Sequence, residues 1–325
     1  MAELFPEEKP FWAEAFTWRG AASARVLPTA FGFGAFATFI YLLYTFAYPG
    51  LVIEVGPHEI AGVLLSLLLV FRTNGGYERW WEARKLWGGI VNQSRNLVLI
   101  ALAHGPADGR WREQIVRWTA AFPYVAKGRL RGDRDIPELK SLLGESQAAG
   151  VRSAEHMPSY VALRISELLR EGCERHGMDR FTFLQAERER CALLDNLGGC
   201  ERIRNTPLAT VYSITIRRFI LLFLGTLPFA LLHKFEVEWL TPVVTFLLAY
   251  PVLTLDLLGI ELQQPFCTRS LNHLPLNDIC HAIEKNLLAL LHEKNGQAYS
   301  ETGLASEASG VSSVSGSGGA CSGPG

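Results

Sequence analysis

The feature that most constrains this chain is a long stretch without charge near its N-terminus. From Val26 to Ile53 no Asp, Glu, Lys or Arg occurs, and most residues are apolar or aromatic. About 20 apolar residues are enough for a helix to cross a bilayer. Acidic as well as basic residues precede the stretch, and it is longer than the apolar part of a signal peptide. We therefore expect a transmembrane helix rather than a cleaved leader or a soluble core helix.

Three further apolar segments follow, so that the chain has two pairs of them. The second segment is short: as a helix, Ile60–Phe71 would cover about 18 Å, against a hydrocarbon core of about 30 Å. It continues into a polar stretch that is helix-compatible except at Gly75 and Gly76. Such a helix fits inside a protein assembly around an aqueous path. We expect membrane segments at about residues 26–53, 58–80, 207–232 and 239–262.

Lys and Arg residues gather on one side of the expected membrane segments. The connection within the first pair, residues 48–59, contains none, and the connection within the second pair contains only Lys234. Others precede the first segment or follow the second: Lys9, Arg19, Arg25, Arg72, Arg79, Arg84, Lys85 and Arg95. By the positive-inside rule, both hairpins enter from the cytoplasm and both termini are cytoplasmic. The six cysteines, which form no CxxC pair, then lie on the reducing side.

The rest of the chain predicts an all-α protein. Residues 1–25 are expected to form a cytosolic N-terminal segment, and residues 81–206 and 263–295 a helical cytosolic region. Residues 296–325 are rich in Gly and Ser and are expected to be disordered. A net charge of −1 argues against a nucleic-acid partner. No nucleotide-binding, hydrolase or metal-ligand motif occurs, so we predict no enzyme activity, no catalytic residue, no metal and no cofactor.

The stripe formed by Val63, Leu67 and Phe71 carries the strongest functional signal. These residues recur every four positions and therefore share one face of a helix. The stripe could serve packing inside one subunit. The short apolar length and the polar continuation favour instead a narrow apolar ring in an aqueous path, which can gate by dewetting.

Residues 71–88, FRTNGGYERWWEARKLWG, resemble the signature of the bacterial bestrophin-related family. The match falls on Arg72, Asn74, Tyr77, Arg79, Trp80, Trp81, Glu82, Arg84, Lys85, Trp87 and Gly88. Two membrane pairs flanking a cytosolic helical region also fit, as do NTPLATVYS and LPLNDICHAIEKNLL, so that the resemblance covers about residues 10–295. It implies a homopentamer around one central pore in the bacterial inner membrane, with lipid and small permeant ions as further partners.

The resemblance further implies a channel for small monovalent ions that is gated at a hydrophobic neck. This neck maps onto Val63, Leu67 and Phe71, and a second constriction, the cytosolic aperture, maps onto Leu208. Animal members conduct chloride, which favours anions, while a monovalent cation (sodium-type) channel of the same fold is an alternative. Two other classes stay open: a membrane-anchored regulatory or scaffold protein without conduction, and a secondary transporter, for which the two pairs lack the expected internal similarity.

One departure from the family concerns calcium. Animal bestrophins carry a Ca²⁺ clamp in an acidic run that follows a Pro-Phe-Gly after the fourth membrane segment. Here Cys267 stands in place of that Gly, and no carboxylate occurs between Pro265 and Asn277. Because a Ca²⁺ site needs several oxygen ligands with carboxylates among them, we predict that this clamp is missing.

Overall fold

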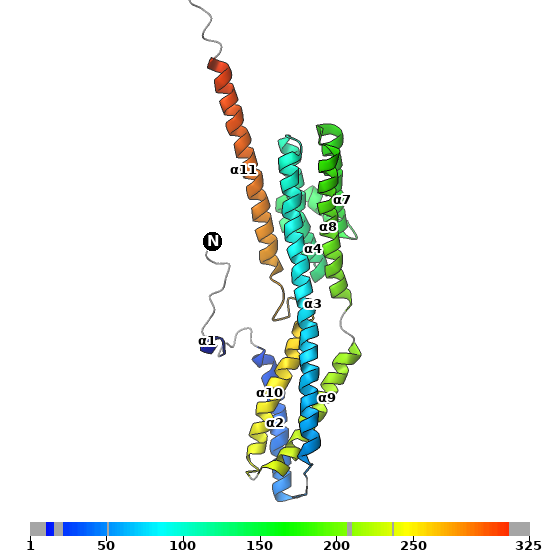
Figure 1. Cartoon of the computed structure of the whole chain (residues 1–325), viewed down its shortest axis with the longest axis vertical. Helices are drawn as coiled ribbons and strands as arrows, with labels where there is room; N and C mark the ends of the chain where they lie inside the picture. The colour runs from blue at the N-terminus through cyan, green and yellow to red at the C-terminus, as the bar shows by residue number, and fades with distance from the viewer. Residues whose placement is uncertain (1–10, 16–21, 51, 207–209, 236, 312–325) are drawn as a thin grey trace, which may run out of the picture. The chain divides into compact units, whose positions relative to one another are not determined.

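The computed structural model describes residues 11–15, 22–50, 52–206, 210–235 and 237–311. Throughout these ranges regular structure is helical and no strand occurs, as the sequence predicted. The helices, labelled in Figure 1, are α1 (Phe11–Ala15), α2 (Ser23–Phe46), α3 (Val55–His104), α4 (Gly109–Arg131), α5 (Glu138–Leu143), α6 (Glu145–Ser153), α7 (Met157–His176), α8 (Arg180–Asn205), α9 (Thr210–Lys234), α10 (Leu240–Glu261) and α11 (Leu276–Val311).

The helices belong to two compact units, each built from two separate stretches of chain. The first unit comprises residues 1–85 and 201–274, and the second comprises residues 86–200 and 275–325. Helices α3 and α8 contribute residues to both.

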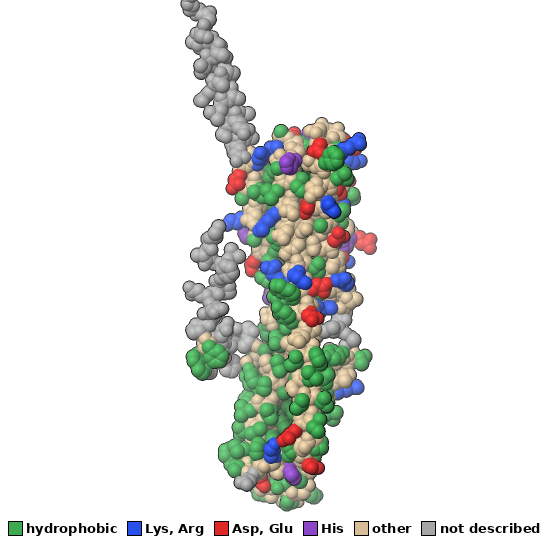
Figure 2. Space-filling model, viewed as in Figure 1, with side chains coloured by type: hydrophobic (Ala, Val, Ile, Leu, Met, Phe, Trp, Pro, Cys, Tyr) green, Lys and Arg blue, Asp and Glu red, His purple; other side chains and the backbone are tan. Residues whose placement is uncertain are grey.

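The first unit holds the four membrane-length helices that the sequence predicted. Ser23–Phe46, Val55–His104, Val211–Lys234 and Leu240–Glu261 are long and apolar enough to cross a membrane. The face of this unit seen in Figure 2 is covered mainly by hydrophobic side chains. Packing within the chain buries only 17% to 33% of each apolar window. Large hydrophobic side chains stay exposed on all four helices, so lipid or further copies of the chain must cover them.

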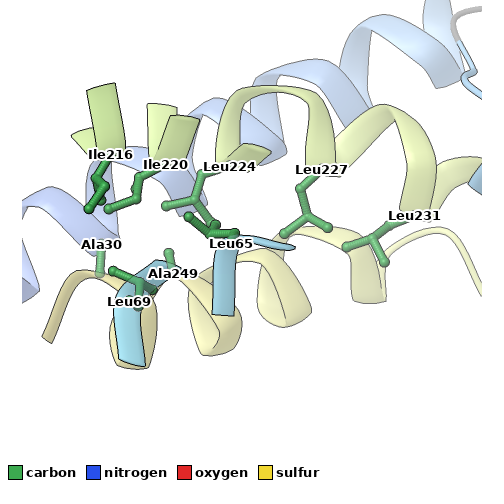
Figure 3. Close-up of a cluster of buried hydrophobic side chains, with 9 residues drawn as sticks. All are labelled: Ala30, Leu65, Leu69, Ile216, Ile220, Leu224, Leu227, Leu231 and Ala249. Carbon is green, nitrogen blue, oxygen red and sulfur yellow. The ribbon is translucent and has the colours of Figure 1, made fainter. Parts of the chain in front are cut away.

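A row of aliphatic side chains forms the core of the first unit. Figure 3 shows Leu65 and Leu69 of α3 beside side chains that recur along one face of α9. The cluster comprises Ala30, Leu65, Leu69, Ile216, Ile220, Leu224, Leu227, Leu231 and Ala249. Because lipid tails are as apolar as leucine, close packing stabilises this core inside a membrane more than removal from water does.

Helix α4 is the centre of the second unit. Asp108 caps its N-terminus, where the carboxylate accepts a hydrogen bond from the Trp111 N–H at 2.6 Å. Gly132, a left-handed residue with φ of 83°, caps its C-terminus. Both are ordinary helix caps. Helix α4 packs against α5, α7 and α11, and the Trp111 indole donates to the Leu168 carbonyl of α7 at 2.8 Å.

Helix α3 differs from the expected second segment in its extent. It continues without interruption from Val55 to His104, so neither residue 80 nor the pair Gly75 and Gly76 ends it. A glycine in a helix costs roughly 1 kcal/mol relative to alanine, which is too little to interrupt a helix that continues on both sides. The reason for Gly76 is tertiary: a Cβ atom there would lie 2.9 Å from the Gly259 carbonyl oxygen.

Two other helices have ends that differ from the ends of the apolar and Gly/Ser-rich segments of the sequence. Helix α2 ends at Phe46 rather than near Ile53, because Pro49 disfavours helical backbone at the residue before it. Helix α11 runs to Val311, and the disorder expected for residues 296–325 stays a prediction. Residues 297–308 include several Ala and Glu, which are good helix formers. The remainder of the expected disordered tail lies outside the described residues.

Candidate functional site: helix α3 and its contacts

Helix α3 presents the three predicted neck residues on one exposed face. Val63 is 69% exposed, Leu67 50% and Phe71 57%, whereas Leu65 and Leu69 are buried. At about 100° of rotation per residue, the exposed and the buried residues lie on opposite sides of the helix. Within one chain the three side chains are therefore not part of the core, and the interpretation as packing inside one subunit loses its basis. Their role as a pore neck stays a prediction.

A buried ion pair marks the opposite face of α3. Arg72 is 1% exposed, and its Nη1 donates to Asp256 Oδ1 of α10. The Arg217 Nε of α9 lies 3.4 Å from the other carboxylate oxygen. Ionisable groups at membrane depth are costly unless they are paired. Three helices thus meet at a single carboxylate, which sets the rotation of α3 and directs Leu67 and Phe71 outward.

The next signature residues bind main-chain carbonyls. Arg79 donates from Nε to the Gln263 carbonyl at 3.0 Å and from Nη1 to the Thr206 carbonyl at 2.7 Å, and its Nη2 donates to the Ile203 carbonyl. These acceptors lie at or just beyond the C-terminal ends of α10 and α8, where the last carbonyls lack helical partners. The Trp80 indole donates to the Asn272 carbonyl at 2.8 Å. Both residues therefore connect α3 to the C-terminal ends of α8 and α10 and to the loop that follows α10.

The other signature residues are distributed over several environments. Trp81 is 46% exposed and its ring stacks on that of Tyr77, with ring centroids 6.5 Å apart. Glu82 pairs with Arg202 at 2.6 Å. Trp87 is fully buried, Gly88 is half-buried, and Asn74, Arg84 and Lys85 are exposed. Arg72, Arg79, Trp80 and Glu82 thus make structural contacts, and among the described residues the signature does not converge on one pocket.

The loop after α10, where we predicted no Ca²⁺ clamp, is held by its own hydrogen bonds. Glu261, at the end of α10, is 8% exposed. Its carboxylate accepts from Arg25 Nη1 at 2.5 Å and from the Leu271 N–H at 2.6 Å. The Leu274 N–H donates to the Pro265 carbonyl at 2.8 Å. No group of three or more His, Cys, Asp and Glu that could hold a metal ion occurs among the described residues.

One predicted residue has no described position, and one structurally engaged carboxylate was missed in the sequence. Leu208, the predicted cytosolic aperture, lies outside the described residues. Glu261 was not singled out from the sequence, although a carboxylate at the end of an apolar segment usually has a positively charged partner. Asp256 is likewise a carboxylate within an apolar segment, and its partners in the structure are Arg72 and Arg217.

Four membrane-length apolar helices, three of which meet at the Asp256 carboxylate, together with a second helical unit rich in charge define an all-α integral membrane protein. Residues 5–289 match the sequence profile of the bacterial and fungal bestrophin proteins. The chain therefore belongs to the bestrophin family, as its signature predicted.

Relatives and solved structures agree with this assignment. The chain is 31% identical over 284 residues to a voltage-dependent anion channel-forming protein of Nostoc sp., covering 86% of this chain and 91% of that protein. It is 32% identical to a protein of the same description in Mesorhizobium japonicum, covering 86% and 89%. The crystal structure of a bacterial bestrophin homologue from Klebsiella pneumoniae superposes with a TM-score of 0.75 and 30% identity, covering 83% of this chain and 98% of that one.

Proposed function

We propose that this protein is a passive channel for small monovalent ions, preferring anions, in the bacterial inner membrane with both termini in the cytoplasm. The observation that carries this proposal is the exposed stripe of Val63, Leu67 and Phe71 opposite the buried face of α3. The relatives from Nostoc sp. and Mesorhizobium japonicum, which are named anion channel-forming proteins, support the choice of anions.

The proposed pore is shared by several copies of the chain. The apolar part of α3, Ile60–Phe71, is too short to match the bilayer by itself, and most of its outward side chains are uncovered within one chain. Copies of the same helix around a common axis would shield it from lipid. The number five comes from the family resemblance.

The proposed gate is the apolar ring that these copies would form. Val63 and Phe71 are eight residues apart, which corresponds to about 12 Å along the helix axis. A ring of this length lined by apolar side chains favours the loss of water, and an ion without hydration is very costly in such a site. Opening would then require the ring to become wet, by widening or by rotation of α3.

The deciding experiment is recording from the purified full chain in planar bilayers under asymmetric KCl. A reversal potential near the chloride equilibrium potential is the expected result. A value near the potassium potential would establish a cation channel of the same fold, and no current from correctly assembled protein would favour a scaffold. Native mass spectrometry of the same sample should give five copies, and a stable monomer or dimer would contradict a shared central pore.

A further inference from the structure

A cavity of about 350 Å³ opens in the first unit between α2, α9 and α10. Its walls are mainly apolar and include Val26 and Phe33 of α2, Leu221 of α9 and Leu253 of α10. Arg25, Arg217 and Asp256 also line it. The cavity therefore combines an apolar interior with charged groups, which is the lining expected for an amphiphile rather than for a fully polar or a fully apolar molecule.

The charges around this cavity do not cancel. Arg25 is matched by Glu261, since Nη1 and Oε1 lie 2.5 Å apart. Asp256 is shared by Arg72 and Arg217, so that two guanidinium groups meet one carboxylate. Arg72 is buried, while the Arg217 side chain is 60% exposed. The surplus positive charge of the cluster is therefore accessible at Arg217.

The position of the cluster along the helices matches the depth of a lipid headgroup. Arg25 lies at the start of α2, Arg217 about two turns into α9, and Asp256 less than two turns before the end of α10. All three therefore lie toward the helix ends that the distribution of Lys and Arg assigns to the cytoplasm. Basic pockets between membrane helices on that side are suited to acidic lipid headgroups.

We propose that this cavity is a binding site for an anionic phospholipid. Arg217 contacts the phosphodiester, and one acyl chain lies along the apolar wall that contains Phe33, Leu221 and Leu253. The apolar wall is the reason to choose a lipid over free phosphate, which would leave that surface uncovered. The proposal goes beyond ion conduction; it depends on the membrane location of α2, α9 and α10 and on the orientation given under the proposed function.

The test is a lipid titration of the full-length protein in mild detergent, followed by native mass spectrometry. Phosphatidylglycerol is the probe, and phosphatidylcholine with the same acyl chains is the comparison. Wild-type protein should bind phosphatidylglycerol more tightly and saturably. Arg217→Gln should weaken phosphatidylglycerol binding about fivefold, as expected for one basic contact, and should weaken phosphatidylcholine binding less, because the choline cation offsets the charge of its phosphodiester. Arg217→Lys, which keeps the charge, should retain most of the preference.

The neighbouring arginine provides a matched control. Arg218 is exposed on the same turn of α9 but does not line the cavity. Arg218→Gln removes the same charge at nearly the same depth and should leave the phosphatidylglycerol affinity unchanged. Equal losses in the two variants would overturn the proposal, because they would show diffuse attraction of acidic lipid to a basic surface.

A second pair of variants tests the apolar wall without altering any charge. Leu221 lines the cavity and Leu222 does not, and the two are 60% and 64% exposed. Leu221→Trp should reduce phosphatidylglycerol binding, whereas Leu222→Trp should not. Displacement of the lipid by inorganic phosphate would assign the site to free phosphate instead. A change in oligomer mass in Leu221→Trp alone would show that a neighbouring subunit fills the cavity, and it would also overturn the proposal.

Discussion

Gly76 of α3 lies directly against the backbone of Gly259 of α10: a Cβ atom on Gly76 would be only 2.9 Å from the Gly259 carbonyl oxygen. On α10, a Cβ atom on Gly259 would in turn be 3.1 Å from the Cγ atom of Arg72. The two glycines allow α3 and α10 to approach closely, and at this distance Arg72 reaches Asp256. Small residues at such crossings are a general feature of membrane helices.

Replacing Gly76 by alanine should therefore destabilise the protein. The added methyl group meets backbone, which cannot rotate away, so α3 and α10 must separate at a cost of roughly 1–3 kcal/mol. A lower thermal midpoint of the purified protein is the expected result. Gly32→Ala is the control, since nothing lies within 4 Å of a Cβ there and alanine is the better helix former. Equal midpoints for Gly76→Ala and wild type would show that this contact does not constrain the helices.

Breaking the buried ion pair should cost more than removing it. Arg72→Met leaves Asp256 with Arg217 at 3.4 Å as its remaining partner, and removal of one member of a buried pair typically costs about 3–5 kcal/mol. We expect low yield and a strongly reduced thermal midpoint for the single variant. The double variant Arg72→Met with Asp256→Leu removes both charges and should recover much of the loss. A double variant as unstable as the single one would show that Arg72 acts through other contacts.

The fold could be predicted from the sequence wherever a long apolar pattern decides the structure. The four membrane helices and the helical remainder follow from the long apolar segments and the absence of alternating patterns. The partners of Asp256 could not be predicted, because Arg72 and Arg217 are distant in the chain and only tertiary packing brings them to one carboxylate. Gly76 looked like a helix interruption because its reason is the backbone of Gly259, which no local pattern reveals. Leu208 came from the family resemblance alone and has no structural description.

Calcium should have no effect on this channel. Glu261, the carboxylate at the start of the loop that follows α10, is engaged by Arg25 and by the Leu271 N–H, so it offers no free ligand. Currents in micromolar Ca²⁺ and in chelator should be equal, and the thermal midpoint should be the same in both. A steep activation by Ca²⁺ would contradict this expectation. Asp278→Asn would then test whether ligands come from the first turn of α11.

Alkaline pH should destabilise the second unit through Cys280 of α11. Burial raises the pKa of its thiol from 9.0 to about 12. The folded state therefore keeps a proton that the unfolded state loses, so the stability contribution is complete below pH 9 and falls as the pH rises from 9 toward 12. Thermal midpoints measured between pH 9 and pH 10 are the readout, because Tyr124, whose pKa burial and Glu284 raise, affects stability mainly above pH 10.

Cys280→Ala should flatten this pH dependence, although it lowers the midpoint somewhat at every pH because it leaves a small cavity. Cys191→Ala is the matched control, since that thiol is exposed. The control should decline with pH as the wild type does. Parallel curves for wild type and Cys280→Ala would show that the buried thiol is not responsible.

Simultaneous replacement of Val63, Leu67 and Phe71 by alanine should raise conductance or open probability, because a wider and less bulky ring loses water less readily. Folding should survive, since these side chains are exposed within one chain and their truncation leaves no cavity in its core. Alanine at three exposed residues of other membrane helices, Phe39, Leu222 and Leu247, is the control and should leave the current unchanged.

The competing interpretation, in which the stripe only packs one subunit against another, makes the opposite prediction for the same variant. Truncating side chains buried between subunits costs roughly 2–5 kcal/mol each, so the oligomer would dissociate and the current would fall in proportion to intact protein. Measuring mass and single-channel current on one preparation separates these cases, since the gate model predicts intact oligomers with larger or longer openings. Intact oligomers with unaltered current would contradict both and would place the gate elsewhere along the path, with Leu208 as the next residue to replace.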